Sequence, residues 1–191
     1  IIGKDIVNDN AKSSGLDWGD YDNDGDMDLF ICNRDGQNNL LYKNNGSGDL
    51  IPVTTGAPVT GGGDSVACRW GDFDNDGDLD LFVLNANQDN FLYQNNNDGT
   101  FLRVYNFDAI SHPGDSRHIS TADYDNDGGL DLFIANYAQG DALYRNTGNA
   151  NNWVAVKLQG TLSNRAGIGA RLTVTATING GTVVQTRGLN Q

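Results

Sequence analysis

Glutamate is absent from this chain of 191 residues, in which all 25 acidic residues are aspartate. Methionine occurs once and proline three times, whereas glycine occurs 25 times. Glutamate favours helices, while aspartate and glycine favour turns, caps and tight metal-binding loops. The composition therefore predicts an all-β protein that is rich in turns and poor in helix.

Positive charge and long apolar runs are also scarce. The 12 Lys and Arg residues leave a formal net charge of −13. No basic cluster is present that would neutralise phosphates, which argues against nucleic acid as a partner. No run of about 18 apolar residues exists, which argues against insertion into a membrane. The chain begins at Ile1 and not with methionine, and we interpret it as a processed chain or a fragment of a longer one.

An aspartate-rich segment occurs three times. Its first copy reads Asp-Tyr-Asp-Asn-Asp-Gly-Asp-Met-Asp-Leu-Phe, and the copies begin at Asp20, Asp72 and Asp123, which lie 52 and 51 residues apart. A second marker, Leu-Tyr-x-Asn, follows each copy at 41–44, 92–95 and 143–146. Two motifs that recur together indicate an internal repeat of about 51 residues.

A period of this length, with short apolar runs, is typical of a unit of about four strands, as in a propeller blade. The Leu-Phe run after each loop predicts a buried strand, the Leu-Tyr marker predicts the next, and a segment such as Thr100–Val104 predicts the outer one. We therefore predict three four-stranded units within residues 11–148. A closed propeller has four to eight blades, so the three are either incomplete or completed by neighbouring copies.

The flanking segments depart from the repeat. Residues 1–10 include a strand-like stretch, Ile1–Val7, placed like the last strand of a unit whose remainder is missing. Such a lone strand must pair, either within this chain or by donation to a neighbouring molecule. Residues 149–191 hold strand-like stretches at 153–158, 171–178 and 182–186, which predict a small β module that is either separate or a cap on the repeats.

Each loop has the form Asp-x-Asp-x-Asp-Gly-x-x-Asp. Calcium is a hard cation that takes six to eight oxygen ligands, and alternate carboxylates on a tightly curling chain supply them. We assign side-chain oxygens to the first, third, fifth and ninth positions and a backbone carbonyl to the seventh, with glycine at the sixth for the sharp turn. These residues are Asp20, Asp22, Asp24, Asp26 and Asp28 in the first loop, Asp72, Asp74, Asp76, Asp78 and Asp80 in the second, and Asp123, Asp125, Asp127, Gly129 and Asp131 in the third.

Other readings of the loops fit less well. An EF-hand needs a bidentate Glu at the twelfth position, where this chain has Ile31, Val83 and Ile134. Magnesium prefers to keep its waters and to bind one or two carboxylates. A lone Asp-rich turn is usually a solvated loop, but so many carboxylates at one spacing repel one another unless a cation is present. The pattern therefore favours three calcium sites.

These loops, with the following Leu-Phe strand and the Leu-Tyr-x-Asn marker, resemble the FG-GAP/VCBS repeats of integrin alpha-subunit propellers and of many secreted bacterial proteins. The stretches at 152–158 and 163–171 resemble the start of the ASPIC/UnbV module that often follows such repeats. The resemblance covers roughly residues 11–188 and implies a calcium-binding β-propeller fold. It implies much less about function.

Cysteine and tryptophan leave two structural questions. Cys32 and Cys68 align with mostly apolar positions of the other units, so they are either small buried hydrophobic side chains or, in an oxidising compartment, a disulfide between successive units. Trp18 and Trp70 each lie two residues before a loop and, like Trp153, are predicted to pack as anchors.

The leading functional hypothesis is a secreted or cell-surface bacterial protein, stabilised by calcium, with a structural or adhesive role. It would associate with copies of itself into a homo-oligomer or filament, with strand exchange as a specific version. No nucleophile, Cys–His or phosphate-loop motif is present, so we do not expect an enzyme. The alternatives are a monomeric propeller module that binds a glycan or protein ligand, and an accessory domain of a carbohydrate-active enzyme.

Overall fold

The computed structural model describes residues 10–111, 114–148, 151, 153–154, 156–161, 169–178 and 181–188. Described residues form thirteen strands and one helical turn, α1 (Ala57–Thr60), which confirms the prediction of an all-β protein. No described helix has the length and apolar character needed to cross a membrane.

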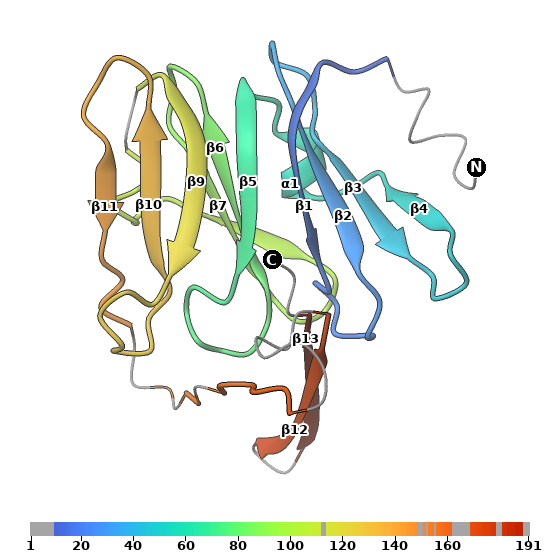
Figure 1. The fold of residues 1–191 in the computed structure, drawn as a ribbon. Helices are drawn as coiled ribbons and strands as arrows, with labels where there is room; N and C mark the ends of the chain where they lie inside the picture. The colour runs from blue at the N-terminus through green and yellow to red at the C-terminus, as the bar shows by residue number, and fades with distance from the viewer. Residues whose placement is uncertain are drawn as a thin grey trace.

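Three antiparallel sheets follow one another along the chain, one for each repeat unit, and are named here blades 1 to 3 (Figure 1). In each blade the first strand leads into the Asp-rich loop, the second follows it, and the third carries the Leu-Tyr marker. Blade 1 contains β1 (Ser13–Gly19), β2 (Asp28–Asn33), β3 (Leu40–Asn44) and β4 (Leu50–Val53); blade 2 contains β5 (Ser65–Gly71), β6 (Asp80–Asn85), β7 (Phe91–Asn95) and β8 (Phe101–Val104); blade 3 contains β9 (Ser116–Ala122), β10 (Asp131–Asn136) and β11 (Ala142–Tyr144).

In the described part of the chain, blade 3 is an incomplete unit, which the prediction of three four-stranded units allowed for. Among the described residues it has three strands, and β11 is its outer strand. The expected lone strand at Ile1–Val7 lies outside the described residues. Blades 1 and 2 have the predicted four strands, and the outer strand expected at Thr100–Val104 is β8.

The innermost strands bring the blades together. Strand β5 packs between β1 and β9, and Figure 1 shows these three strands side by side, with blade 1 and blade 3 at the two ends of an open arc. Glycine permits the close approach, because a Cβ atom added at Gly15 of β1 would lie 2.6 Å from the carbonyl oxygen of Val66 in β5.

Two apolar cores fill the interfaces between successive blades. We define the front face of a blade as the face toward the preceding blade and the back face as the face toward the following blade. Phe30 on the back face of blade 1 packs with Trp70 on the front face of blade 2, and Phe82 on the back face of blade 2 lies in one cluster with Leu132 on the front face of blade 3. The core is therefore built between blades.

Cys32 and Cys68 both lie in the core between blades 1 and 2 as free, buried thiols. A hydrogen bond with Cys32, together with burial, raises the pKa of the Cys68 thiol. Of the two readings left open by the sequence, the structure has the small buried side chains.

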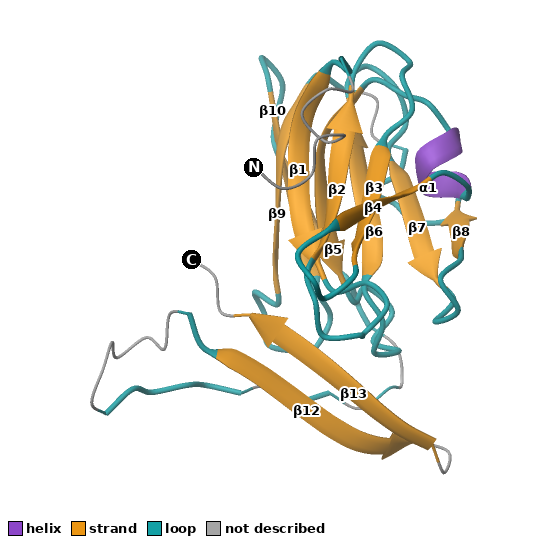
Figure 2. Cartoon of the chain, turned by 90° about the vertical axis from the view of Figure 1, so that its right-hand side faces the viewer, coloured by secondary structure: helices purple, strands orange, loops and turns teal. Residues whose placement is uncertain are grey.

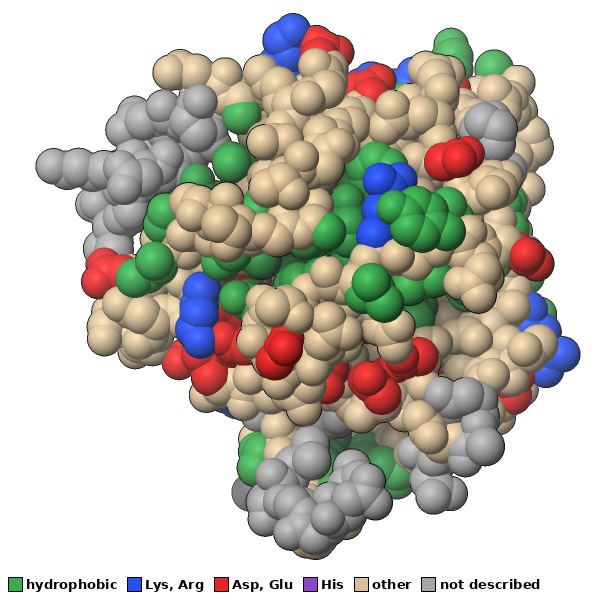
Figure 3. All heavy atoms as spheres, turned by 180° about the vertical axis from the view of Figure 1, so that it is seen from behind, with side chains coloured by type: hydrophobic (Ala, Val, Ile, Leu, Met, Phe, Trp, Pro, Cys, Tyr) green, Lys and Arg blue, Asp and Glu red, His purple; other side chains and the backbone are tan. Residues whose placement is uncertain are grey.

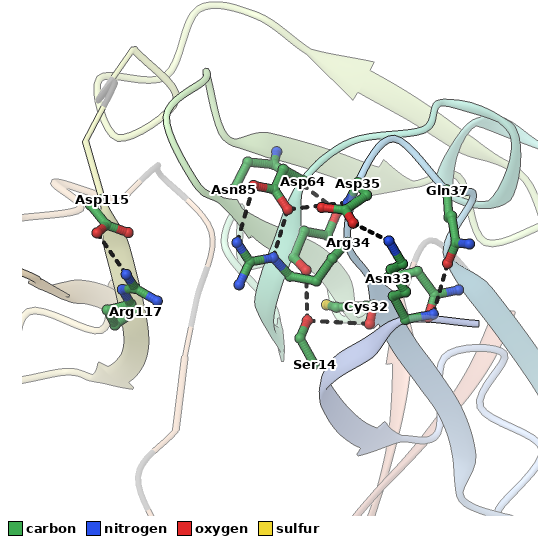
Figure 4. A network of polar contacts seen from close by, with 12 residues as sticks. Ser14, Cys32, Asn33, Arg34, Asp35, Gln37, Asp64, Asn85, Asp115 and Arg117 are labelled. Carbon is green, nitrogen blue, oxygen red and sulfur yellow. Dashed lines mark hydrogen bonds and ion pairs between the residues drawn. The ribbon is translucent and has the colours of Figure 1, made fainter. Parts of the chain in front are cut away.

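A polar network joins blades 1 and 2 at the end of the strands away from the Asp-rich loops (Figure 4). The Arg34 guanidinium donates from Nε to Asp64 Oδ1 at 2.6 Å and from Nη2 to Asp64 Oδ2 at 3.1 Å. This side-chain hydrogen bonding lowers the pKa of Asp64. The bidentate geometry fixes the orientation of the two blades more than it adds stability, since the pair is partly exposed to solvent.

The C-terminal region contains a hairpin of β12 (Arg171–Ile178) and β13 (Gly181–Gly188), which lies below the loop end of the blades (Figure 2). These strands match two of the three predicted there. A third strand at 153–158 was expected, but the described residues of that stretch belong to no strand. Within the described part of the chain, β12 and β13 pair only with each other, so no neighbouring strand is available there to pair with residues 153–158, and an alternating sequence needs such a partner to form a sheet.

Candidate metal sites

The three Asp-rich loops share one backbone conformation. Glycine at the sixth position has positive φ in every loop, as with Gly25 at 97°, and so has asparagine at the fourth, as with Asn23 at 56°. In each loop the glycine N–H donates to the carboxylate of the first Asp at 3.1 Å. The predicted sharp turn at glycine is confirmed, and the asparagines are explained because Asn tolerates the left-handed region.

Each loop gathers three carboxylates that offer oxygen atoms within 4.8 Å of one another. The first and second loops bring together positions one, three and nine, and the third brings together positions one, three and five. The groups are Asp20, Asp22 and Asp28; Asp72, Asp74 and Asp80; and Asp123, Asp125 and Asp127. An all-oxygen, anionic donor set of this kind can hold a hard divalent cation.

The ninth-position aspartate also bridges two backbone segments. Asp80 is 2% exposed, and its Oδ2 accepts the Phe73 N–H at 3.0 Å while its Oδ1 accepts the Asn95 N–H at 2.9 Å. Asp28 and Asp131 make the same pair of bonds in their own blades. This carboxylate therefore ties the start of the loop to the end of the marker strand, and each oxygen keeps a second lone-pair direction for a cation.

Burial disfavours the charged form of these carboxylates when no cation is bound. Burial raises the pKa of Asp80 to about 8, although backbone hydrogen bonds, first from Asn95, oppose the shift. Burial likewise raises the pKa of Asp28 to about 7 and that of Asp72 to about 6, where the neighbouring Asp76 charge adds to it. Crowded carboxylates that lose hydration are stabilised in their charged form by a bound cation, so the residues present fit a metal ion.

A long polar side chain lies against each loop, and sequence reasoning missed it. Lys43 forms ion pairs with Asp22 and Asp24, and Gln94 donates to Asp74. Arg145 pairs with Asp125 at 2.5 Å and with Asp127 at 2.8 Å. All three occupy the variable position of the Leu-Tyr-x-Asn marker, so a long donor at that position in every copy was the available signal.

The marker asparagine joins neighbouring blades. In blade 2, Asn95 Nδ2 donates to the carbonyl of Leu79 in its own blade at 3.1 Å and to the carbonyl of Tyr21 in blade 1 at 2.7 Å. In blade 3, Asn146 Nδ2 reaches the carbonyl of Phe73 in blade 2 at 2.7 Å. Because the backbone N–H of the same asparagine is held by the ninth-position aspartate, the second and third loops are each coupled to the interface with the preceding blade.

The seventh position has a side-chain role of its own in the second loop. Asp78 Oδ1 accepts a hydrogen bond from Asn23 Nδ2 of the first loop at 2.7 Å. In the third loop, where Gly129 occupies the seventh position, Asn75 Nδ2 instead donates to the Gly128 carbonyl at 3.0 Å. The Asp78 carboxylate thus accepts a hydrogen bond from the first loop. This is consistent with the prediction that only the backbone carbonyl of the seventh position binds a metal.

The C-terminal region contacts all three loops from outside. Arg171 donates to the Gly25 carbonyl of the first loop, and Asn151 Nδ2 donates to the Asn75 carbonyl of the second at 2.8 Å. The Trp153 indole lies on Gly128 of the third, where an added Cβ would meet it at 2.1 Å. Trp153 remains half exposed, so its role is to cover a loop, whereas Trp70 is the buried anchor that was predicted.

Acidic side chains gather on the loop end of the molecule, as Figure 3 shows from behind. Among the described residues, the nine carboxylates of the three groups account for most of the predicted side-chain ligands. Asp24 and Asp76 instead accept backbone N–H groups two residues ahead, at 3.0 Å in both cases. Asp131 is held by the N–H groups of Tyr124 and Asn146. The ligand role of all the predicted residues stays a prediction.

Comparison with known proteins identifies the repeats. The family model of the FG-GAP-like repeat matches residues 20–83 and 72–134. Cartilage acidic protein 1 of Xenopus tropicalis is 30% identical over 131 residues, which cover 65% of this chain and 20% of that protein. The chain thus spans about a fifth of the length of this curated relative.

Among solved structures, one described as the structural basis of specific recognition of non-reducing terminal N-acetylglucosamine by an Agrocybe aegerita lectin is similar. It is 23% identical with a TM-score of 0.45, and the match covers 88% of this chain and 45% of that one. The family match spans more than half of the chain and coincides with the three loops and the strands that follow them. The chain therefore belongs to the FG-GAP-like repeat family.

Proposed function

We propose that this chain is a calcium-stabilised structural or adhesive module that works outside the cell and associates with copies of itself. The observation that carries the proposal is the position of the three carboxylate groups. Each lies in a loop whose neighbours, Asn23, Asn95 and Asn146, bond to the adjacent blade. A cation bound there would hold blades together, which is a structural role and not a catalytic one.

Several features support the finer parts of this proposal. Loops that offer only oxygen ligands suit the high calcium concentration outside cells. We assign the chain to a secreted bacterial protein because its repeats resemble those of many such proteins. The blades form an open arc, and an open β-array needs a partner to cover its ends. We assign residues 11–148 to the repeats and 149–191 to an ASPIC/UnbV-like module, with residues 1–10 as a strand available for donation.

Strand donation is tested by deleting residues 1–9. In calcium, the full chain is expected to assemble, as seen by light scattering after size exclusion and by electron microscopy. The deletion variant is expected to remain monomeric with an unchanged circular dichroism spectrum. A control that replaces Lys4 and Asp5 by Ser keeps the apolar residues of the segment and should assemble like the full chain. A full chain that is monomeric at all concentrations would contradict self-association, and unchanged assembly of the deletion variant would exclude strand donation.

A groove favours ligand recognition as a second candidate function. This open groove of about 550 Å³ lies between blades 1 and 2, at the end away from the loops. It is lined by Gly36, Gly61, Gly62, Gly63, Asp64, Gln88, Asp89 and Phe91. Exposed glycine backbone beside a carboxylate and an amide offers the hydrogen-bonding groups that a glycan needs.

If the groove binds a glycan, Asp89→Ala combined with Gln88→Ala should remove the signal on a glycan array. Asp98→Ala, at an exposed turn outside the groove, should not. A signal that both variants retain would exclude the groove as the binding site.

A further inference from the structure

The exposure of equivalent residues changes abruptly at blade 3. On the back faces of blades 1 and 2, Phe30 and Phe82 are fully buried, because the front face of the following blade covers them. The equivalent Phe133 of blade 3 is 43% exposed, and its cross-strand neighbour Leu143 is 54% exposed. The back face of blade 3 thus has the composition of a blade interface but no described blade against it.

The front face of blade 1 shows the complementary change. Trp70 on the front face of blade 2 is 6% exposed and stacks on Tyr21 of blade 1, with ring centroids 5.9 Å apart and an angle of 10° between the planes. Trp18, at the same position before the first loop, is 46% exposed, and Tyr124, at the position of Tyr21 in the third loop, is 52% exposed. Both members of the tyrosine–tryptophan stack therefore occur again, exposed, one in blade 1 and the other in blade 3.

The hydrogen bond between the marker asparagine and the preceding blade also has, among the described residues, an unused counterpart at each end of the arc. Asn95 donates to the carbonyl of its own blade and to that of Tyr21 in the preceding blade. Asn44, at the same position of blade 1, donates to the Met27 carbonyl of its own blade at 3.2 Å. The Tyr124 carbonyl is the equivalent acceptor on blade 3. If blade 1 of another copy packed on the back face of blade 3, Tyr124 would offer its ring to Trp18 and its carbonyl to Asn44.

We propose that the back face of blade 3 binds the front face of blade 1 of a second copy of this chain. Trp18 would stack on Tyr124, and Asn44 would donate to the Tyr124 carbonyl, as Trp70 and Asn95 do with Tyr21 inside the chain. Leu29, Ile31 and Tyr42, at the centre of the blade 1 front face, are already buried, so the contact is made by the inner strand and the loop edge. This inference rests on the proposed self-association and names the surfaces that carry it.

A second copy is the fitting occupant because the contact is already made between blades 1 and 2 with the same residue types. Such a contact joins two different surfaces, so it is heterologous, and repeated use gives a closed ring or an extended filament. A donated strand that completes blade 3 would arrive from the same copy, since residues 1–9 directly precede blade 1 in the chain. The two contacts act together, and neither alone is expected to hold the assembly at the concentrations tested.

The test uses one variant for each face. Trp18→Asp removes the front face and Phe133→Asp removes the back face, and both positions are exposed, so folding should be retained. At a concentration where the unmodified chain is assembled, each variant alone is expected to be monomeric by light scattering. An equimolar mixture is expected to give a dimer and nothing larger, because one intact front face and one intact back face remain.

Leu102→Asp places the same charge on an exposed apolar position of β8, outside both faces, and should assemble like the unmodified chain. Circular dichroism and the thermal midpoint check that all three variants are folded. If the chain assembles and either face variant still does so alone, or if the mixture stays monomeric, the proposed faces are wrong while self-association stands. If the unmodified chain is itself monomeric at every concentration, both proposals fail.

Discussion

Removal of divalent cations with EDTA is expected to lower the thermal unfolding midpoint of this chain by about 15 °C or more. A ligand at a hundred times its dissociation constant stabilises the folded state by about 2.7 kcal/mol per site. Three such sites contribute about 8 kcal/mol, and a chain of this size changes its midpoint by about 2–4 °C per kcal/mol. The effect is large because the carboxylates of each loop are crowded and partly buried, and their mutual repulsion returns when the cation leaves.

The measurement is a pair of melting curves, before and after chelation, with elemental analysis of bound metal. Calcium added back should restore the midpoint, whereas magnesium at equal concentration should restore little, because it gives up its waters reluctantly. Asp22→Asn, Asp74→Asn and Asp125→Asn should each remove one bound ion of three, and Asp89→Asn, outside the loops, should remove none. A midpoint indifferent to chelator, in a protein without bound metal, would overturn the calcium proposal.

The second large effect is expected for Asp80→Ala, which should lower the free energy of unfolding by about 3–5 kcal/mol. The substitution leaves the N–H groups of Phe73 and Asn95 buried without their acceptor. It also releases Asn95, whose side chain holds the Tyr21 carbonyl of blade 1. The cost is therefore partly independent of the metal.

Measurements in a chelator separate the stability that comes from the bound metal from the stability that comes from the backbone hydrogen bonds of Asp80. In EDTA, Asp74→Asn should be no less stable than the unmodified chain, because asparagine keeps an oxygen that can accept from Gln94 and from the Asp76 N–H, and the repulsion with Asp76 is removed. Asp80→Ala should stay clearly destabilised. Asp131→Ala removes the same kind of bridge at the end of the arc and should cost less, since Tyr124 beside it is half exposed. Urea denaturation with and without chelator measures all three. Equal stability of Asp80→Ala and Asp89→Ala in EDTA would show that the bridge does not matter.

Much of the fold was predictable because the repeat places turns and strands in register. The Asp-rich loop ends one strand and the Leu-Phe run begins the next, so Asp28 opens β2 and Asp80 opens β6. The glycine turn followed from the loop composition. The repeated sequence forms a repeated structure, since the first two copies place equivalent apolar residues, Phe30 and Phe82, against the following blade.

Other features depend on which surfaces meet, and a single sequence does not carry that information. Trp18 and Trp70 have the same local context, yet only Trp70 is buried, because a described blade lies in front of blade 2 and none lies in front of blade 1. Sequence reasoning treated Asp80 as a ligand alone and missed its two backbone bonds. It also missed Lys43, because a long polar side chain in a strand resembles an ordinary exposed position until the strand is placed beside the loop.

The asparagine that links successive blades has a consequence for how such a protein grows. Asn95 and Asn146 each reach back to a main-chain carbonyl of the blade before, and a main-chain carbonyl is present whatever side chain the residue carries. The link therefore makes no demand on the identity of its acceptor, Tyr21 in one case and Phe73 in the other. A blade inserted by gene duplication anywhere along the arc would therefore find a backbone acceptor for its asparagine in the preceding blade. Proteins of this family can gain blades without a change in the residue that accepts this hydrogen bond.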